Sequence, residues 1–437
     1  MGVGRWLTGL AASGDVPVFA AVGAGGRALA DDAALLPGVR LVDSPRAANV
    51  LLIVGAVTPP LLGPLLGIHD QLPTPRATVW WASGAVGGRL ASALPDLVVG
   101  RDGDGDHLRT VFAELLSGGR RSEPPALPDQ EAAEWRGVGP FGQGGTGMTG
   151  GVPYGRPLAA RAPDPDGLEL DQLPLRVGPL FPPFPPGLIL EIELQGDVVR
   201  QATVGDNPFT GRIEGEDGPP LDTALFVGAL DRPTPIADLE VARARHHLCW
   251  AARTLRLHGL ECEGLRLLGR ARSLVPAERA AVESQAQRIA RSRSLAWATR
   301  GVGVLEPDEV IGGPVARAAG LAVDARFHDP AYQGLGFSPV VHGAGDARDR
   351  LRQRLAEAVQ ALELAELAGS QLRRPGPPLE GPRGPLRTGE PLPSVALLGL
   401  LPSLLAGQEW GDAMTIVASL DLDLEEAAVG QPAGMSA

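Results

Sequence analysis

The chain of 437 residues is long enough for two or three domains, and 44% hydrophobic against 21% charged residues allows a sizeable core. A net charge of -12 argues against a nucleic-acid-binding protein, because such binding needs a basic face that releases counterions from phosphates. The only cysteines are Cys249 and Cys262. One such chain cannot by itself supply the four thiolates of a usual iron–sulfur cluster, nor a zinc site made of cysteines alone.

The sequence also carries no pattern for secretion or membrane spanning. Its first residues lack the charged, apolar and small-residue regions of a signal peptide. The longest apolar stretch, residues 50–68, is interrupted by prolines, whereas a spanning helix needs about 20 uninterrupted apolar residues. We therefore expect a cytoplasmic protein that does not cross a membrane by itself.

Short β-rich runs alternate with helix-like segments in the first part of the chain. The expected strands are residues 16–23, 50–57, 78–83 and 96–100, and the expected helices include residues 61–71 and 107–116. This alternation predicts a parallel sheet covered by helices on both faces, which we assign to an α/β domain of residues 1–116. In such sheets the functional groups lie in loops beyond the carboxyl ends of the strands.

The rest of the chain divides into a connector and a mainly helical domain. Residues 117–176 are rich in proline and glycine and predict a linker or an extended arm. Residues 177–437 open with a hairpin at 187–199, whose turn is Gln195-Gly196. Helical periodicity then predicts helices at 238–257, 277–294, 345–367, 394–405 and 412–421.

The first domain contains the segments "LTGLAASGD" (7–15) and "SPRAANVLLIVGAVTPPLLGPLLGIHDQLPTPRATVWWASGAVGG" (44–88). In these segments it resembles the cluster-bearing small subunit shared by respiratory complex I and membrane-bound [NiFe] hydrogenases. In that family four cysteines hold the cluster. The matching positions here are Ala12, Ser13, Gly84 and Arg101. The resemblance therefore implies a flavodoxin-like α/β domain that has lost its cluster ligands.

The second half resembles the large subunit of the same families. The segments that carry this resemblance are residues 177–199, 299–324, 342–364 and 391–421. They imply a hydrogenase large-subunit-like helical domain with a small β-hairpin element. The whole chain therefore resembles a natural fusion of the two subunits.

The resemblance also shows which reactive residues are replaced. In the hydrogenases two Cys-x-x-Cys pairs hold nickel and iron. The matching positions are Ala237 and Glu240 for the first pair and Asp423 and Glu426 for the second. The histidines of the first hairpin, one of which holds the quinone headgroup in complex I, become Phe181 and Pro185, and no matching tyrosine is found. The family's central helices are shortened between Gly269 and Pro276.

Two groups of polar residues remain open to a functional interpretation. His246, Cys249, His258 and Cys262 have helical spacings that suit a zinc site, although a free cysteine is more commonly a small buried residue. Glu240, Asp423 and Glu426 are expected either to bind a hard cation, to relay a proton, or simply to fill a vacated site that is open to water. We favour the last interpretation.

These observations predict a redox-inactive peripheral subunit of a complex I-like membrane complex, without a cofactor and without redox catalysis of its own. It would dock on antiporter-like membrane subunits at the cytoplasmic face and cap or gate the translocation of ions, protons or solutes. One alternative is an NADH-quinone-oxidoreductase-type component that binds quinone or relays electrons through partner chains. Another is a soluble Cys/His zinc-binding protein. A flavin is a further possibility, but no phosphate-binding loop is evident.

Overall fold

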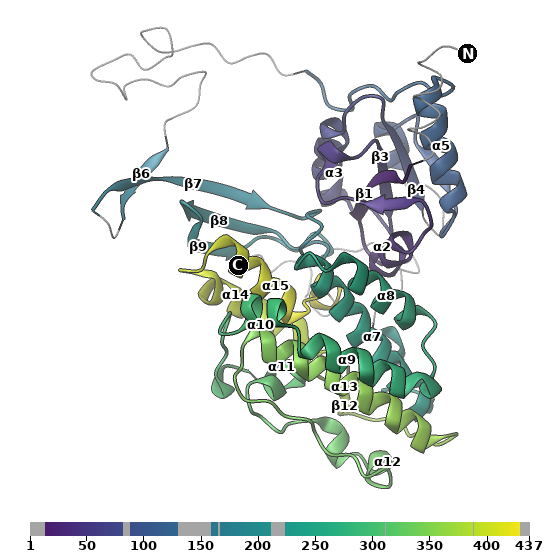
Figure 1. Ribbon diagram of the computed structural model, residues 1–437, viewed down its shortest axis with the longest axis vertical. Coiled ribbons are helices and arrows are strands. Elements are labelled where there is room, and N and C mark those ends of the chain that lie inside the picture. The colour runs from purple at the N-terminus through teal and green to yellow at the C-terminus, as the bar shows by residue number, and fades with distance from the viewer. Residues whose placement is uncertain are drawn as a thin grey trace.

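The computed structural model describes residues 14–81, 88–129, 159–164, 167–210, 223–310, 312–387 and 389–428. Figure 1 shows an α/β unit at one end, a larger helical unit at the other, and an antiparallel sheet that reaches out beside the two. A parallel α/β sheet in the N-terminal part and a helical C-terminal part confirm the fold class predicted from the sequence at this level.

The N-terminal sheet has five parallel strands in the order β2-β1-β3-β4-β5. The strands are β1 (Val16–Val22), β2 (Val39–Leu41), β3 (Val50–Val54), β4 (Ala77–Trp81) and β5 (Val98–Gly100). The helices are α2 (Arg27–Ala34), α3 (Pro59–Gln71), α4 (Gly88–Ala93) and α5 (Gly105–Ser117). Every residue of β3 and β4 is buried, as expected of central strands covered on both faces.

Successive residues of β3 point to opposite faces of the sheet and enter two different cores. Leu51 and Ile53 pack in the core that includes Leu61 and Leu65 of α3. The alternate residues of β3 pack in the core that includes Phe112 of α5. The apolar run of β3 therefore fixes α3 and α5 on opposite sides of the sheet.

The helical unit is built around α7 (Ile236–Leu257) and α13 (Ala347–Ala368), which pack along each other. Helix α13 begins after Asp346, whose side chain accepts a hydrogen bond from the backbone N–H of Asp349. The other helices are α6 (Ala224–Gly228), α8 (Glu261–Arg272), α9 (Arg279–Ala290), α10 (Arg293–Thr299), α11 (Gly313–Ala318), α12 (Pro330–Gln333), α14 (Pro393–Leu405), α15 (Trp410–Leu420) and α16 (Leu424–Ala428). Two small ladders join β10 (Thr234–Pro235) to β11 (Leu372–Arg373) and β12 (Leu379–Glu380) to β13 (Pro385–Leu386).

The expected hairpin is part of a larger antiparallel sheet with the order β6-β7-β8-β9. Its strands are β6 (Ala160–Pro163), β7 (Glu169–Val177), β8 (Leu190–Gln195) and β9 (Val198–Val204). Strands β6 and β7 come from the stretch that the sequence assigned to a linker or arm. In Figure 1 they extend beyond the hairpin as an arm. The β9 edge is covered, because Val199 exchanges backbone hydrogen bonds with Gly407 and Gln408 at 2.7 and 2.8 Å.

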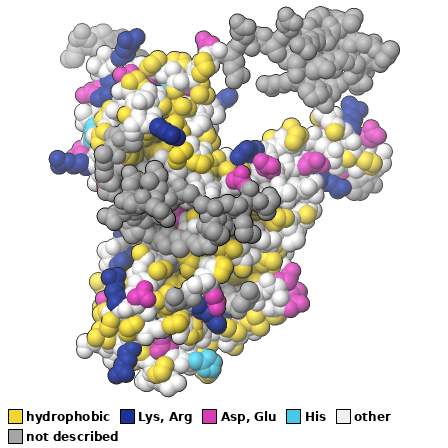
Figure 2. Space-filling view, turned by 180° about the vertical axis from the view of Figure 1, so that it is seen from behind, with side chains coloured by type: hydrophobic (Ala, Val, Ile, Leu, Met, Phe, Trp, Pro, Cys, Tyr) yellow, Lys and Arg dark blue, Asp and Glu magenta, His cyan; other side chains and the backbone are white. Residues whose placement is uncertain are grey.

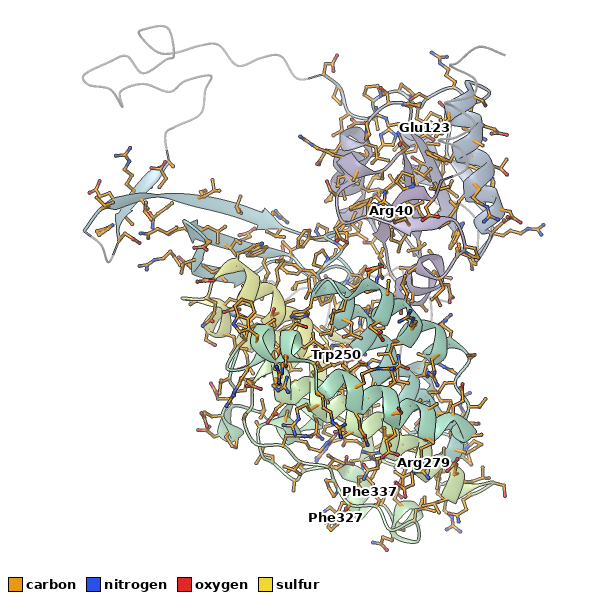
Figure 3. The ribbon with its side chains drawn as sticks, viewed as in Figure 1. Arg40, Glu123, Trp250, Arg279, Phe327 and Phe337 are labelled. Carbon is orange, nitrogen blue, oxygen red and sulfur yellow. The ribbon has the colours of Figure 1, made fainter. Side chains whose placement is uncertain are left out.

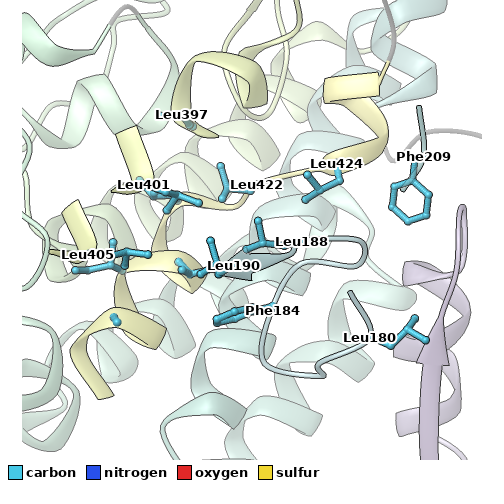
Figure 4. Close-up of a cluster of buried hydrophobic side chains, with 14 of the residues drawn as sticks. Leu180, Phe184, Leu188, Leu190, Phe209, Leu397, Leu401, Leu405, Leu422 and Leu424 are labelled. Carbon is cyan, nitrogen blue, oxygen red and sulfur yellow. The ribbon is translucent and has the colours of Figure 1, made fainter. Parts of the chain in front are cut away.

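The two halves of the chain share one hydrophobic core. Phe19, Leu51 and Leu65 of the α/β unit belong to the same buried cluster as side chains from the hairpin and the C-terminal helices. Figure 4 labels members of this cluster from the hairpin region and the C-terminal region: Leu180, Phe184, Leu188, Leu190, Phe209, Leu397, Leu401, Leu405, Leu422 and Leu424. The burial of this apolar surface holds the two halves together.

Polar contacts at the edge of the α/β unit anchor the start of the connector. His69 lies 3.0 Å from Glu123 through Nε2 and 2.7 Å from Asp70 through Nδ1. Glu123 also accepts hydrogen bonds from the backbone N–H and the hydroxyl of Thr78, both at 2.7 Å. Burial disfavours the ionised form of Asp70, but backbone N–H donors from residues 126 and 127 outweigh it and lower the pKa of Asp70. The connector is thus held on the sheet as far as residue 127.

None of the helices in the described ranges is long and apolar enough to cross a membrane.

Replacing Glu123 with alanine should destabilise the α/β unit by about 2–4 kcal/mol, because it leaves the buried groups of His69 and Thr78 without their acceptor. Urea unfolding of the full chain measures this loss. The matched control is Glu114→Ala, which removes a half-exposed ion pair with Arg120 and should cost less than about 1 kcal/mol. Equal losses in the two variants would contradict the role given to Glu123.

Candidate functional site

Of the four predicted cluster positions, only Arg101 lies within the described residues. Ala12, Ser13 and Gly84 lie outside those residues. Arg101 is exposed in the loop before α5. Asp104 in the same loop caps α5 by accepting a hydrogen bond from the backbone N–H of His107 at 2.9 Å. The acidic loop around Arg101 therefore serves to start a helix.

Glu240, which the sequence resemblance aligns with a nickel-ligand position, lies on α7 and is completely buried. Its carboxylate lies 3.2 Å from Arg243 and 3.0 Å from Arg326, and it accepts a hydrogen bond from the hydroxyl of Tyr332 at 2.7 Å. Burial and the adjacent Glu240 hold the pKa of Tyr332 well above its ordinary value. The phenol therefore stays protonated and acts as the hydrogen-bond donor to Glu240. Ala237, one turn earlier, is half-buried.

A second buried ion pair lies between α11 and α13. Arg317 binds Glu357 with two parallel hydrogen bonds of 2.7 and 3.0 Å, and Glu380 with a third of 2.8 Å. Burial disfavours the charged form of Glu357, but Arg317 outweighs it and holds the pKa of Glu357 well below its ordinary value. Burial and nearby Asp324 raise the pKa of Glu380. The two carboxyl groups on one arginine are therefore electrostatically unequal.

His247 joins this ion pair to the next one. Its Nε2 lies 3.3 Å from Glu357, and its Nδ1 accepts a hydrogen bond from Arg354 at 3.3 Å. Burial lowers the pKa of His247 to about 3, so the imidazole is neutral at physiological pH. Arg354 in turn lies 3.1 Å from Asp421.

The C-terminal carboxylates gather around Arg383. Its guanidinium lies 2.9 Å from Glu426 and 3.2 Å from Asp423, which the sequence resemblance aligns with the second cysteine pair. Burial raises the pKa of Glu426 although Arg383 opposes this effect. Asp421 lies 2.6 Å from His246. Burial disfavours the charged form of Asp421, but Arg383 and His246 outweigh it and keep its pKa well below the ordinary value.

These groups form one continuous set that we call the buried arginine network. Its members are Arg243, Arg317, Arg326, Arg354 and Arg383 with Glu240, Asp324, Glu357, Glu380, Asp421, Asp423, Glu426 and the linking His247. Two of its arginines lie over aromatic rings, Arg354 over Trp250 at 4.9 Å and Arg326 over Phe337 at 4.3 Å. Figure 3 labels both rings, Trp250 near the α/β unit and Phe337 toward the far end of the helical unit. The network thus runs through most of the helical unit.

The expectation that the vacated site is open to water is wrong. Glu240 and Glu426 are 0% exposed and Asp423 is 5% exposed. Guanidinium groups supply the positive charge beside each carboxylate, and Arg is well suited to this because it stays charged and binds carboxylates with two donors. The site is filled by the chain's own cations.

The structure does not bring the four residues of the candidate zinc site together. His246 faces Asp421, and His258 lies 2.8 Å from the carbonyl of Thr254 through Nδ1. Cys249 is buried, whereas Cys262 is exposed on α8. Within the described ranges there is no group of three or more His, Cys, Asp or Glu side chains that could hold a metal ion.

Phe181 and Pro185, which the sequence resemblance aligns with hairpin histidines of the family, line a cavity of about 260 Å³ between the two halves of the chain. One wall comes from β1, α2 and the residues after β2, and another from the proline-rich loop 179–186. The remainder comes from the C-terminal part of α7 and from residues 418–422. Asp421 of the buried arginine network reaches this cavity, so the two features are connected.

One feature beside the cavity was missed from the sequence. Gly23, Gly25 and Ala28 have the spacing G-x-G-x-x-A, directly after β1 and at the start of α2, next to the cavity-lining residues Val22 and Arg27. This is the spacing and the context of a dinucleotide-binding fingerprint. The sequence signal was present in "VGAGGRALA", but it could be recognised only once a strand and a helix were known to flank it.

Comparisons with known proteins place part of the helical unit in a known class. Residues 267–382 match the family model described as the 49 kDa subunit of respiratory-chain NADH dehydrogenase. The resemblance to the large subunit of complex I is thereby confirmed for this stretch, which extends from α8 to the loop after β12.

Among solved structures, a chain from an archaeal respiratory membrane complex, the membrane-bound sulfane sulfur reductase, aligns with 59% of this chain and 98% of its own length. Its sequence identity is 18% and its TM-score is 0.45, which does not establish a common fold. No curated protein matches the sequence.

Replacing Arg317 with methionine should reduce the free energy of unfolding by about 3–5 kcal/mol, because Glu357 and Glu380 would stay buried without their counterion. Urea unfolding measures the loss, and Arg317→Lys should recover part of it. The control is Arg352→Met on the surface side of α13, which should cost less than about 1 kcal/mol. If Arg317→Met were as stable as the wild type, a structural role for these ion pairs would be ruled out.

The stability of the protein should fall as the pH decreases from about 6.5, in part because of His247. An unfolded histidine binds a proton near pH 6.5, whereas folded His247 does so only near pH 3. Between these values the unfolded state takes up one more proton at this residue, which costs up to about 1.4 kcal/mol of stability per pH unit.

Urea unfolding at several pH values between 4.5 and 7 tests this effect. His247→Asn should give a shallower dependence, by up to one proton, whereas the exposed His328→Asn should not change it. Parallel curves for wild type and His247→Asn would show that His247 is protonated in the folded protein.

Proposed function

We propose that the protein is a redox-inactive peripheral subunit of a complex I-like membrane assembly. It docks on antiporter-like membrane subunits at the cytoplasmic face and caps or gates the movement of ions, protons or solutes through them. It combines a small-subunit-like and a large-subunit-like unit in one chain. The family match of residues 267–382 supports the complex I-like origin, and the strand order β2-β1-β3-β4-β5 supports a flavodoxin-like first unit.

The main support for a redox-inactive role comes from the side chains at the positions that the resemblance aligns with the metal ligands of hydrogenases. Glu240, Asp423 and Glu426 replace three of the four hydrogenase cysteines, and each lies within 3.2 Å of a buried guanidinium group. A metal ion placed there would meet arginine cations and would have to separate buried ion pairs, at a cost of several kcal/mol. The two cysteines of the whole chain are too few for a four-thiolate cluster.

Two neighbouring surfaces support docking on an apolar partner. The chain carries no charged residue from 391 to 408, a stretch that includes all of α14, and several leucines of this helix are only partly buried. On β7, Leu173 and Leu175 are 51% and 36% exposed. They lie on the sheet face of Ile192, which packs in the shared core with α14. Figure 2 shows hydrophobic side chains together with charged ones along the arm.

A second candidate function is quinone binding in the cavity between the halves. Its favouring observation is that Phe181 and Pro185, where the resemblance places quinone-contacting histidines, line this cavity. Its walls are mainly apolar, as is common for small-molecule sites. Quinone binding would return the protein to the oxidoreductase class.

A mild-detergent pull-down of the tagged full chain from its native membranes, followed by mass spectrometry, tests the proposal. We expect antiporter-like membrane proteins without iron–sulfur or flavin subunits. The double variant Leu173→Glu/Leu175→Glu should reduce their recovery about tenfold, because it places charge in an apolar interface. Gln201→Glu on the exposed part of β9 is the matched control and should leave recovery unchanged.

Recovery of ferredoxin-like or flavin-bearing chains would contradict the redox-inactive role. Equal recovery with the double variant would instead remove β7 from the docking surface.

A further inference from the structure

The loop between β1 and α2 combines a fingerprint sequence with an anion already bound to it. Gly25 adopts a φ of +69°, and its backbone N–H donates a 2.7 Å hydrogen bond to the carboxylate of Glu425, 400 residues later in the chain. In dinucleotide-binding proteins the backbone N–H groups at this position, at the start of the helix, receive a phosphate. The loop in this protein therefore holds a negatively charged group where a phosphate would bind.

The glycines of this loop do not all have the same explanation. A Cβ on Gly23 would lie 2.3 Å from the carbonyl oxygen of Ala56, and one on Gly26 would lie 2.3 Å from that of Val54. Close packing on the loop after β3 therefore requires these two glycines. Gly25 is different: it has a positive φ, and its N–H donates a hydrogen bond to Glu425. The anion contact is a separate property of the loop.

A carboxylate lies where the same fingerprint places its ribose-binding group. Asp43 follows β2 and is 20 residues after Gly23, the spacing at which an acidic residue binds the ribose hydroxyls. Asp43 is exposed and lines the cavity between the halves, together with Arg27 from the first turn of α2. Val22 and Leu41 contribute apolar side chains to the wall of the same cavity. The cavity of about 260 Å³ is slightly smaller than the usual range of about 300–1,000 Å³ for small-molecule sites.

We propose that this cavity is a binding site for a ribonucleotide. Asp43 accepts the hydrogen bonds of the ribose hydroxyls, and the base lies against the apolar wall and the proline-rich loop. The phosphate replaces the carboxylate of Glu425 at Gly25, close to Arg27. Glu425 thus occupies the phosphate position in the ligand-free protein, and the nucleotide competes with the C-terminal segment for it. This site goes beyond the docking role and would couple nucleotide binding to the contact between the halves.

Isothermal titration of the full chain with AMP tests the site. We expect 1:1 binding, about tenfold weaker binding for Asp43→Ala, and about threefold tighter binding for Glu425→Gln, since an amide is the weaker competitor for the N–H of Gly25. Asp96→Ala, an exposed acidic residue before β5, is the control and should leave the affinity unchanged.

A ligand variant gives an independent check on the ribose contact. The 2′,3′-dideoxy analogue of AMP should bind about tenfold more weakly than AMP to the wild type and equally well to Asp43→Ala.

The proposal would be overturned if AMP did not bind, or if its affinity were the same for the wild type, Asp43→Ala and Glu425→Gln. Displacement of bound AMP by a short-chain quinone would show that the two ligands share the cavity and would leave the nucleotide site in place. If the quinone binds saturably and AMP does not bind, the nucleotide proposal would be overturned in favour of quinone binding. These results are independent of the pull-down, so the docking role and the nucleotide site can fail separately.

Discussion

The structure depends on the burial of charge in the helical unit. Moving a guanidinium or a carboxylate out of water costs several kcal/mol, and only well-placed partners recover that cost. Arg317, Arg326 and Arg383 are each within 3.1 Å of at least one buried carboxylate. Their partners come from α7, α13, the segment around β12 and the C-terminal segment. These elements must therefore assemble together, because a displaced element would leave a buried charge without its partner.

The same requirement gives the proposed loss of metal ligands a physical basis. In the proposal, carboxylates take the positions that hold thiolates in the family that the sequence resembles. Arg383 lies 3.2 Å from Asp423 and 2.9 Å from Glu426 and provides the positive charge beside them. An arginine cation cannot leave, change its oxidation state or exchange with solvent. The replacement keeps the interior electrostatically satisfied and gives up the chemistry that a metal would supply.

Much of the fold could be predicted from the sequence, because the spacing of apolar residues and the length of apolar runs indicate helices and strands directly. The buried run of β3 and the capped start of α13 at Asp346 are examples. Strands β6 and β7 could not be predicted, since their sequence is polar and proline-rich and their pairing depends on β8. At the site, alignment identified Glu240 and Glu426. Arg326 is 86 residues from Glu240, and Arg383 is 43 residues from Glu426. Pairings at such separations leave no local pattern in the sequence, so the expectation of a water-filled space could not be corrected from the sequence.

The C-terminal segment has a consequence for how the protein is made. Leu422 and Leu424 complete the core that both halves share, and Glu425 contacts the loop after the first strand. These residues are synthesised long after the surface that they cover, since Glu425 follows Gly25 by 400 residues. Their share of the apolar surface of the α/β unit therefore stays uncovered until the C-terminal segment has been made. The order of synthesis thus delays the closure of the core that joins the two halves.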